Sequence, residues 1–97
     1  MTLPDGSTLY YEQYGNAGPA VLLCTGLGGL ASFWHEYVGE LASSYRVICY
    51  DHRGTGKSTA SPPPYSVDDM VNDAVELLDG LGVEKVHFCG HSTGGAI

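Results

Sequence analysis

Ser92 has one glycine two residues before it and another two residues after it. It lies where an apolar run ends and a helix is expected to begin. Residues 90–94 read Gly-His-Ser-Thr-Gly, and the pattern G-x-S-x-G is typical of a sharp strand-to-helix turn that exposes a nucleophilic serine. The flanking positions must lack side chains because strand and helix approach closely there. We therefore predict that Ser92 is a nucleophile and that the backbone N–H of Thr93 stabilises an oxyanion. The alternative is that Ser92 only caps the helix.

A second glycine-rich segment, residues 25–29 (Thr-Gly-Leu-Gly-Gly), follows an earlier apolar run. Acyl transfer needs two N–H donors aimed at the developing oxyanion, and one of them is expected from the loop after an earlier central strand. We assign this second donor to the backbone N–H of Leu27. The alternative is that the glycines serve only to turn the chain.

A serine hydroxyl is a poor nucleophile unless a histidine accepts its proton and an acid orients that histidine. Where a G-x-S-x-G serine works with these two partners, the chain order is serine, acid, histidine, so both partners follow the serine. We expect both beyond Ile97, so the 97-residue chain alone should be inactive. His91 is adjacent to Ser92, but neighbouring side chains point apart, so we expect it to pack beside the turn.

The remaining histidines are expected to have no catalytic role. His35 begins a helix and should be exposed, whereas His87 lies on the same side of a strand as Cys89 and should belong to the sheet core or face. His52 and Arg53 should brace the loop that follows a strand.

A rival motif occupies residues 54–58 (Gly-Thr-Gly-Lys-Ser) and imitates the end of a phosphate-binding loop. That loop requires glycine at position 51, where Asp51 places a negative charge instead. Three prolines at 62–64 also forbid the helix that should follow the lysine. Nucleotide binding is therefore not predicted.

The elements that position these segments alternate along the chain. We expect a hairpin over residues 3–14 turning at Asp5-Gly6, and apolar strands at 20–24, 46–50 and 86–90. A first helix is predicted by apolar residues at helical spacing from Trp34 to Ala42. A second begins at a capping box formed by Ser66 and Asp69 and ends at Gly80 and Gly82. Its apolar stripe comprises Val67, Met70, Val71, Ala74, Leu77, Leu78 and Leu81.

This alternation predicts an α/β fold, a parallel sheet with helices on both faces. We interpret residues 1–97 as the N-terminal portion of a single, incomplete domain. The last strand would leave an unprotected sheet edge and an uncovered apolar face. The isolated piece should therefore be poorly soluble or molten.

Composition limits the partners. The net charge of −7, with only four basic residues, gives polyanions and anionic membranes little to attract. The chain shows no membrane-spanning run and no signal peptide, which favours a cytoplasmic protein. Three widely spaced cysteines, Cys24, Cys49 and Cys89, fit neither a zinc site nor a disulfide framework, so we expect buried thiols and no metal.

Taken together, residues 25–29, the Asp-His-Arg-Gly-Thr-Gly-Lys-Ser run at 51–58 and residues 90–95 resemble the α/β-hydrolase superfamily. The resemblance implies a mostly parallel sheet of about eight strands, with the strand ending at Cys24 beside the strand ending at Gly90. The closest likeness is to 3-oxoadipate enol-lactonases and aminoacrylate hydrolases of pyrimidine use. Many relatives carry His-Gly where this chain has Thr25-Gly26, which puts the detailed geometry of that loop in question.

We therefore predict a cofactor-free serine hydrolase of a small carboxylic ester, lactone or related acyl compound, working through an acyl-enzyme. Two alternatives remain on the same scaffold: a cofactor-free haloperoxidase or perhydrolase, and a carbon–carbon bond hydrolase. A third is a non-catalytic, hydrolase-like binding protein. The residues present fix neither the substrate nor the oligomeric state.

Overall fold

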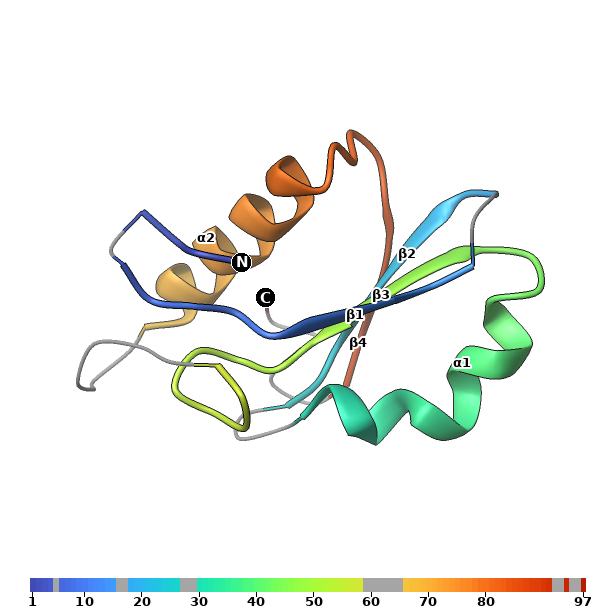
Figure 1. The fold of residues 1–97 in the computed structure, drawn as a ribbon, viewed down its shortest axis with the longest axis horizontal. Helices are drawn as coiled ribbons and strands as arrows, with labels where there is room; N and C mark the ends of the chain where they lie inside the picture. The colour runs from blue at the N-terminus through green and yellow to red at the C-terminus, as the bar shows by residue number, and fades with distance from the viewer. Residues whose placement is uncertain (5, 16–17, 27–29, 59–65, 92–93, 95–96) are drawn as a thin grey trace.

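Four strands form one mixed sheet in the order β1-β3-β2-β4 (Figure 1). The computed structural model describes residues 1–4, 6–15, 18–26, 30–58, 66–91, 94 and 97. β1 pairs antiparallel with β3, whereas β2 pairs parallel with β3 and with β4. The elements are β1 (Tyr11–Tyr14), β2 (Ala20–Cys24), the short 3-10 helix η1 (Ala31–Trp34), α1 (His35–Leu41), β3 (Arg46–Tyr50), α2 (Val67–Gly80) and β4 (His87–Gly90).

The two helices cover opposite faces of the sheet (Figure 1). Side chains alternate along β2 and β3, so Leu22 and Ile48 join the core under α2, while Leu23 and Val47 join the core under α1. From its second residue onward, each of these two central strands is apolar and buried, as expected of parallel strands covered on both faces. The predicted α/β fold and its central strands are confirmed.

The predicted hairpin is shorter than expected. A tight turn joins Leu3 N–H to the Ser7 carbonyl at 2.7 Å, and one isolated bridge pairs Thr2 with Thr8. Leu9 and Met1 exchange both of their backbone hydrogen bonds, at 2.8 and 2.9 Å. Tyr10 then bonds to other segments: its N–H donates to the Ser58 hydroxyl at 2.9 Å and its carbonyl accepts from Asp51 N–H at 3.0 Å. The regular strand consequently begins only at residue 11, and it pairs with β3 rather than with the start of the chain.

The capping box that begins α2 is confirmed. The Ser66 hydroxyl accepts from Asp69 N–H at 3.1 Å, and the Asp69 carboxylate accepts from Ser66 N–H at 2.9 Å. The predicted stripe is correct at its centre, where Met70, Ala74 and Leu77 are buried, but Val67 is 44% exposed at the first turn. Among the described residues, no helix combines the length and apolarity needed to span a bilayer.

β4 departs from its predictions at one residue. All four of its residues are exposed, which fits the predicted unprotected edge and a sheet-face position for His87, but Cys89 was expected to be a buried thiol. β4 pairs on one side only, and the core under α1 is built from β2 and β3 without it. The edge position therefore overrides the apolar character of the strand. Cys24 and Cys49 are buried free thiols, as predicted.

Glu12 of β1 collects several polar partners on the α1 side of the sheet, the Cys49 thiol at 3.7 Å among them. Its carboxylate accepts from the hydroxyls of Tyr10 at 2.6 Å and Tyr14 at 2.7 Å, and it lies 2.7 Å from His35 Nε2. Partial burial alone would raise the pKa of Glu12, but the hydrogen bonds from these three groups outweigh it and lower the pKa to about 2. His35 is exposed, as predicted, and ties the start of α1 to β1.

This cluster should make stability depend on pH. A glutamate in an unfolded chain has a pKa of about 4.3, so the folded carboxylate stabilises the protein above that value and loses its contribution as pH falls through about 2. In the full-length protein, Glu12→Gln should lower the free energy of unfolding by about 1 kcal/mol at pH 7. The difference from the parent should shrink between pH 5 and pH 2.

Urea unfolding at several pH values measures this dependence. Glu40→Gln is the matched control, because it removes an exposed carboxylate from α1. A Glu12→Gln deficit that stays constant down to pH 2 would contradict the account.

Candidate active site

The two glycine-rich segments leave the sheet side by side. In the parallel pairing of β2 with β4, Cys24 lies opposite Gly90, so residues 25–29 and 91–94 begin at the same edge of the sheet. The chain leaves β2 for β3 through α1 on one face and reaches β4 through α2 on the other face (Figure 1). Such a reversal between neighbouring strands is where open α/β sheets bind ligands. The neighbour relation implied by the resemblance is confirmed.

The turn after β4 packs directly on the end of β2. His91 N–H donates to the Cys24 carbonyl at 3.0 Å, and Gly94 N–H donates to the His91 carbonyl at 3.0 Å. A Cβ at Gly94 would clash with the carbonyl oxygens of Cys24 and Thr25. The predicted need for glycine at this position therefore has a specific cause, which is backbone contact with the start of the 25–29 segment.

The three predicted site residues themselves, Ser92, Thr93 and Leu27, lie outside the described residues. The structure describes the flanks of each segment: Gly90, His91 and Gly94 around the serine, and Thr25, Gly26 and Leu30 around the leucine. These flanks determine how the two segments are anchored.

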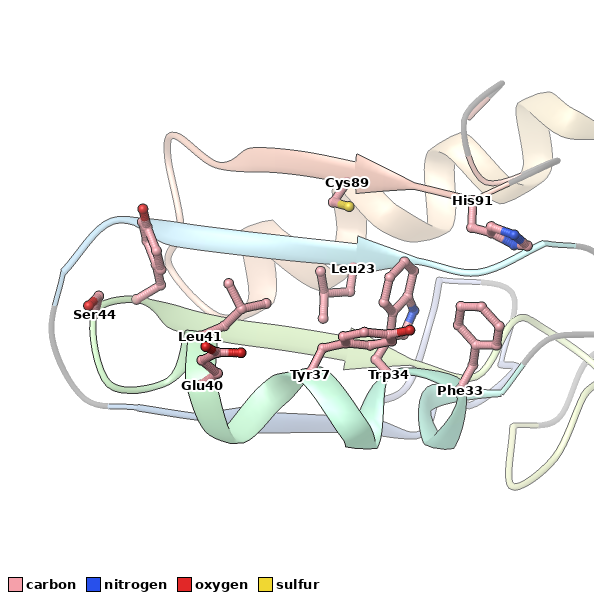
Figure 2. A pocket seen from close by; sticks show the side chains of 10 residues that line it. Leu23, Phe33, Trp34, Tyr37, Glu40, Leu41, Ser44, Cys89 and His91 are labelled. Carbon is pink, nitrogen blue, oxygen red and sulfur yellow. The ribbon is translucent and has the colours of Figure 1, made fainter.

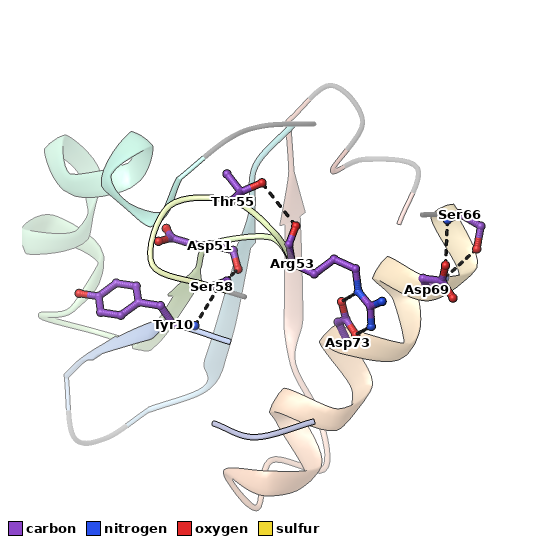
Figure 3. Close-up of polar contacts among 8 residues, drawn as sticks. All are labelled: Tyr10, Asp51, Arg53, Thr55, Ser58, Ser66, Asp69 and Asp73. Carbon is purple, nitrogen blue, oxygen red and sulfur yellow. Dashed lines mark hydrogen bonds and ion pairs between the residues drawn. The ribbon is translucent and has the colours of Figure 1, made fainter. Parts of the chain in front are cut away.

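Asp51 anchors the far end of the 25–29 segment. Its buried carboxylate accepts from Ala31 N–H at 2.7 Å and from Lys57 N–H at 2.9 Å. Its carbonyl accepts from the Ser58 hydroxyl at 2.8 Å, and Figure 3 shows Asp51 beside Ser58. The negatively charged carboxylate already occupies the Lys57 N–H, which disfavours a phosphate at this loop. This role was missed from the sequence, where Asp51 served only to argue against a phosphate-binding loop.

His52 and Arg53 brace the structure, as predicted. The His52 ring is 2% exposed, and its Nε2 lies 2.8 Å from the Thr25 carbonyl, which anchors the near end of the 25–29 segment. Arg53 makes a two-bond ion pair with Asp73 of α2, at 2.6 and 2.7 Å (Figure 3). Asp73 was missed, although its sequence position gave a signal: it is an acid between Met70 and Leu77 of the apolar stripe.

The buried thiol of Cys24, at the end of β2, is unreactive. Burial raises the pKa of Cys24, and its sulfur lies 3.2 Å from the hydroxyl of Tyr50, whose pKa burial also raises. A thiol held neutral in this way is a poor nucleophile. Among the residues that the structure describes, no three His, Cys, Asp or Glu side chains gather to hold a metal ion.

An apolar cavity of about 520 Å³ lies along the α1 face of the sheet. It runs from Ser44, between α1 and β3, to Phe33 and His91, which lie at the end toward which the β2 and β4 arrows point (Figure 2). Most of its lining comes from η1, α1 and the residues that follow α1, with Leu23 of β2 and Cys89 of β4 completing it. Only its Phe33–His91 end adjoins the two glycine-rich segments.

Comparisons with known proteins agree with this geometry. A family model described as alpha/beta hydrolase fold matches residues 19–97. A Caulobacter segnis protein, provisionally named carbamate hydrolase RutD, is 53% identical over 100 residues, which cover 98% of this chain and 38% of that relative. The crystal structure of a Pseudomonas aeruginosa hydrolase matches with a TM-score of 0.93 at 36% identity, over 98% of this chain and 36% of that one.

An enol-lactonase from Burkholderia xenovorans matches with a TM-score of 0.88 at 35% identity, over 94% of this chain and 36% of that one. The chain thus spans a little over a third of the length of these relatives.

The close approach at Gly94 can be tested by adding one methyl group. In the full-length protein, Gly94→Ala should lower the free energy of unfolding by about 1–3 kcal/mol, because the new Cβ meets backbone oxygens that cannot rotate away. Gly39→Ala is the matched control: its Cβ meets nothing within 4 Å, and alanine in a helix should stabilise by about 0.5–1 kcal/mol. Thermal and urea unfolding measure both, and equal behaviour of the two variants would refute the packing at Gly94.

Proposed function

Because this chain belongs to the alpha/beta hydrolase fold family, we propose that the protein is a serine hydrolase acting on a small acyl compound. The observation that carries the proposal is the parallel pairing of β2 with β4, in which Cys24 lies opposite Gly90. The segment that contains Leu27 and the segment that contains Ser92 therefore begin at the same end of these two strands. The sequence supplies a serine in one segment and a glycine-rich run of backbone N–H groups in the other. Acyl transfer needs a nucleophile and oxyanion donors placed together in this way.

In the proposed reaction, the Ser92 oxygen attacks the carbonyl carbon of the substrate and its proton passes to a general base. The carbonyl oxygen becomes an oxyanion that accepts hydrogen bonds from the N–H groups of Leu27 and Thr93. The leaving group departs with a proton, and water then releases the acid from the acyl-enzyme and restores the serine.

The general base is proposed to come from the remainder of the protein. His52 is assigned another role: a carbonyl oxygen only accepts, so its Nε2 carries the hydrogen that faces Thr25, and the buried ring anchors the 25–29 segment. His35 pairs with Glu12, and His87 begins β4, at the end of the strand opposite to Ser92. This assignment follows the order serine, acid, histidine.

The substrate class is proposed from the relatives as well as from the site. One relative is named for carbamate hydrolysis and one structural neighbour is an enol-lactonase. Carbamates, lactones and esters share a carbonyl carbon bonded to a nitrogen or oxygen leaving group. We therefore propose this shared group, in a small molecule, as the bond that is cleaved.

The nucleophile is tested on the full-length protein with p-nitrophenyl acetate and with an alkyl fluorophosphonate. The parent should release p-nitrophenol and gain the mass of one phosphonyl group at Ser92. Ser92→Ala should lose both, with a fall in kcat of at least about 10³-fold.

Ser66→Ala is the matched control, since Ser66 begins α2 and belongs to the capping box rather than to the site. It should keep full labelling while unfolding at a lower temperature. Full activity of Ser92→Ala, or labelling at another residue, would overturn the proposal.

A further inference from the structure

An aromatic contact joins the two segments of the site. The ring of His91, next to Ser92 in the chain, lies 5.0 Å from the ring of Phe33, centroid to centroid, with 32° between the ring planes. Phe33 lies in η1, four residues after Gly29. In Figure 2 the two side chains face each other at the end of the cavity nearest the site. The proposed function gives neither residue a role.

The burial of the two residues argues against a role in the core. Phe33 is 48% exposed, and His91 is exposed as well. Phe33 is held on its other side by Trp34, edge to face at 5.0 Å and 88°, and Trp34 is itself buried in the core under α1. The stack thus connects a rigid core residue, through an exposed ring, to the residue that precedes Ser92.

The other anchors of the 25–29 segment act on its backbone. At the near end, the Thr25 carbonyl is held by His52 and the Cys24 carbonyl by His91 N–H. At the far end, Ala31 N–H is held by Asp51. These bonds fix where the segment starts and stops. The stack is the side-chain contact, among the described residues, that sets η1 against the turn after β4.

We propose that His91 and Phe33 form a positioning pair, which sets the distance between the serine segment and the segment that carries the oxyanion donor. This inference rests on the proposed function and extends it. The pair touches no reacting atom. It acts by keeping two separately anchored segments in one geometry, so its loss should slow the acylation of Ser92 more than it weakens substrate binding or folding.

The expected effect follows from the strength of such contacts. An aromatic pair contributes about 0.5–1.5 kcal/mol beyond its buried area, which corresponds to about a two- to tenfold change in rate. His91→Ala and Phe33→Ala should each slow single-turnover acylation by p-nitrophenyl acetate by about that factor. The dissociation constant of the substrate should change little, and the midpoint of thermal unfolding should fall by no more than the few degrees that the loss of such a contact costs.

A double-mutant cycle distinguishes a pair from two independent residues. If His91 and Phe33 act together, the doubly substituted protein should acylate no more slowly than either single variant. His91→Phe and Phe33→Tyr keep a ring at each position and should retain the parent rate. Phe33→Leu keeps bulk without a ring and should be slow, and it decides the matter if the alanine variants do not fold.

Tyr37→Ala is the matched control, because it removes an exposed aromatic ring that contacts Trp34 but not His91. It should acylate at the parent rate. The positioning role is overturned if the alanine variants acylate like the parent, if their effects multiply in the double variant, or if Phe33→Leu matches Phe33→Tyr. Failure of the proposed function is recognised separately, by phosphonate labelling that survives Ser92→Ala.

Discussion

The parallel pairing of β2 with β4, closed by the contact of Gly94 with the carbonyls of Cys24 and Thr25, is the constraint on which the site depends. A parallel ladder brings equivalent ends of its strands together, so whatever follows Cys24 must begin beside whatever follows Gly90. The bond from His91 N–H to the Cys24 carbonyl extends this pairing beyond the last regular residue of β4. The position of the serine segment is thereby determined by main-chain geometry.

Contacts from the residues after β3 hold the 25–29 segment as well. Asp51 and His52 come directly after β3, and each ties one end of the 25–29 segment to the end of that strand. Arg53 then carries the connection to α2 through its buried ion pair with Asp73. Removing one partner of such a pair leaves an uncompensated charge, which costs far more than the pair contributes. Three consecutive residues therefore join three elements: η1, β2 and α2.

Much of this arrangement was predictable from sequence because it follows from local patterns. The apolar runs at 20–24 and 46–50, the capping box at Ser66 and the spacing of the glycine-rich segments each have a short-range physical cause. The misses have long-range causes. The exposure of Cys89 depends on the place of β4 in the sheet order, and the course of the chain after Leu9 depends on the bonds of Tyr10 to Ser58 and Asp51. Ala31, which donates to Asp51, and Asp73, which pairs with Arg53, each lie twenty residues away along the chain. Local sequence patterns do not predict contacts at that separation.

The framing of the serine segment by main-chain oxygens has a consequence for how this scaffold diversifies. Backbone carbonyls are present whatever the side chain, so the alignment of the two segments does not depend on the identity of Cys24 or Thr25. A change of side chain at Thr25 would leave in place the carbonyl oxygen that faces Gly94. The side chains around the site can therefore differ while the main-chain contact at Gly94 keeps the same geometry.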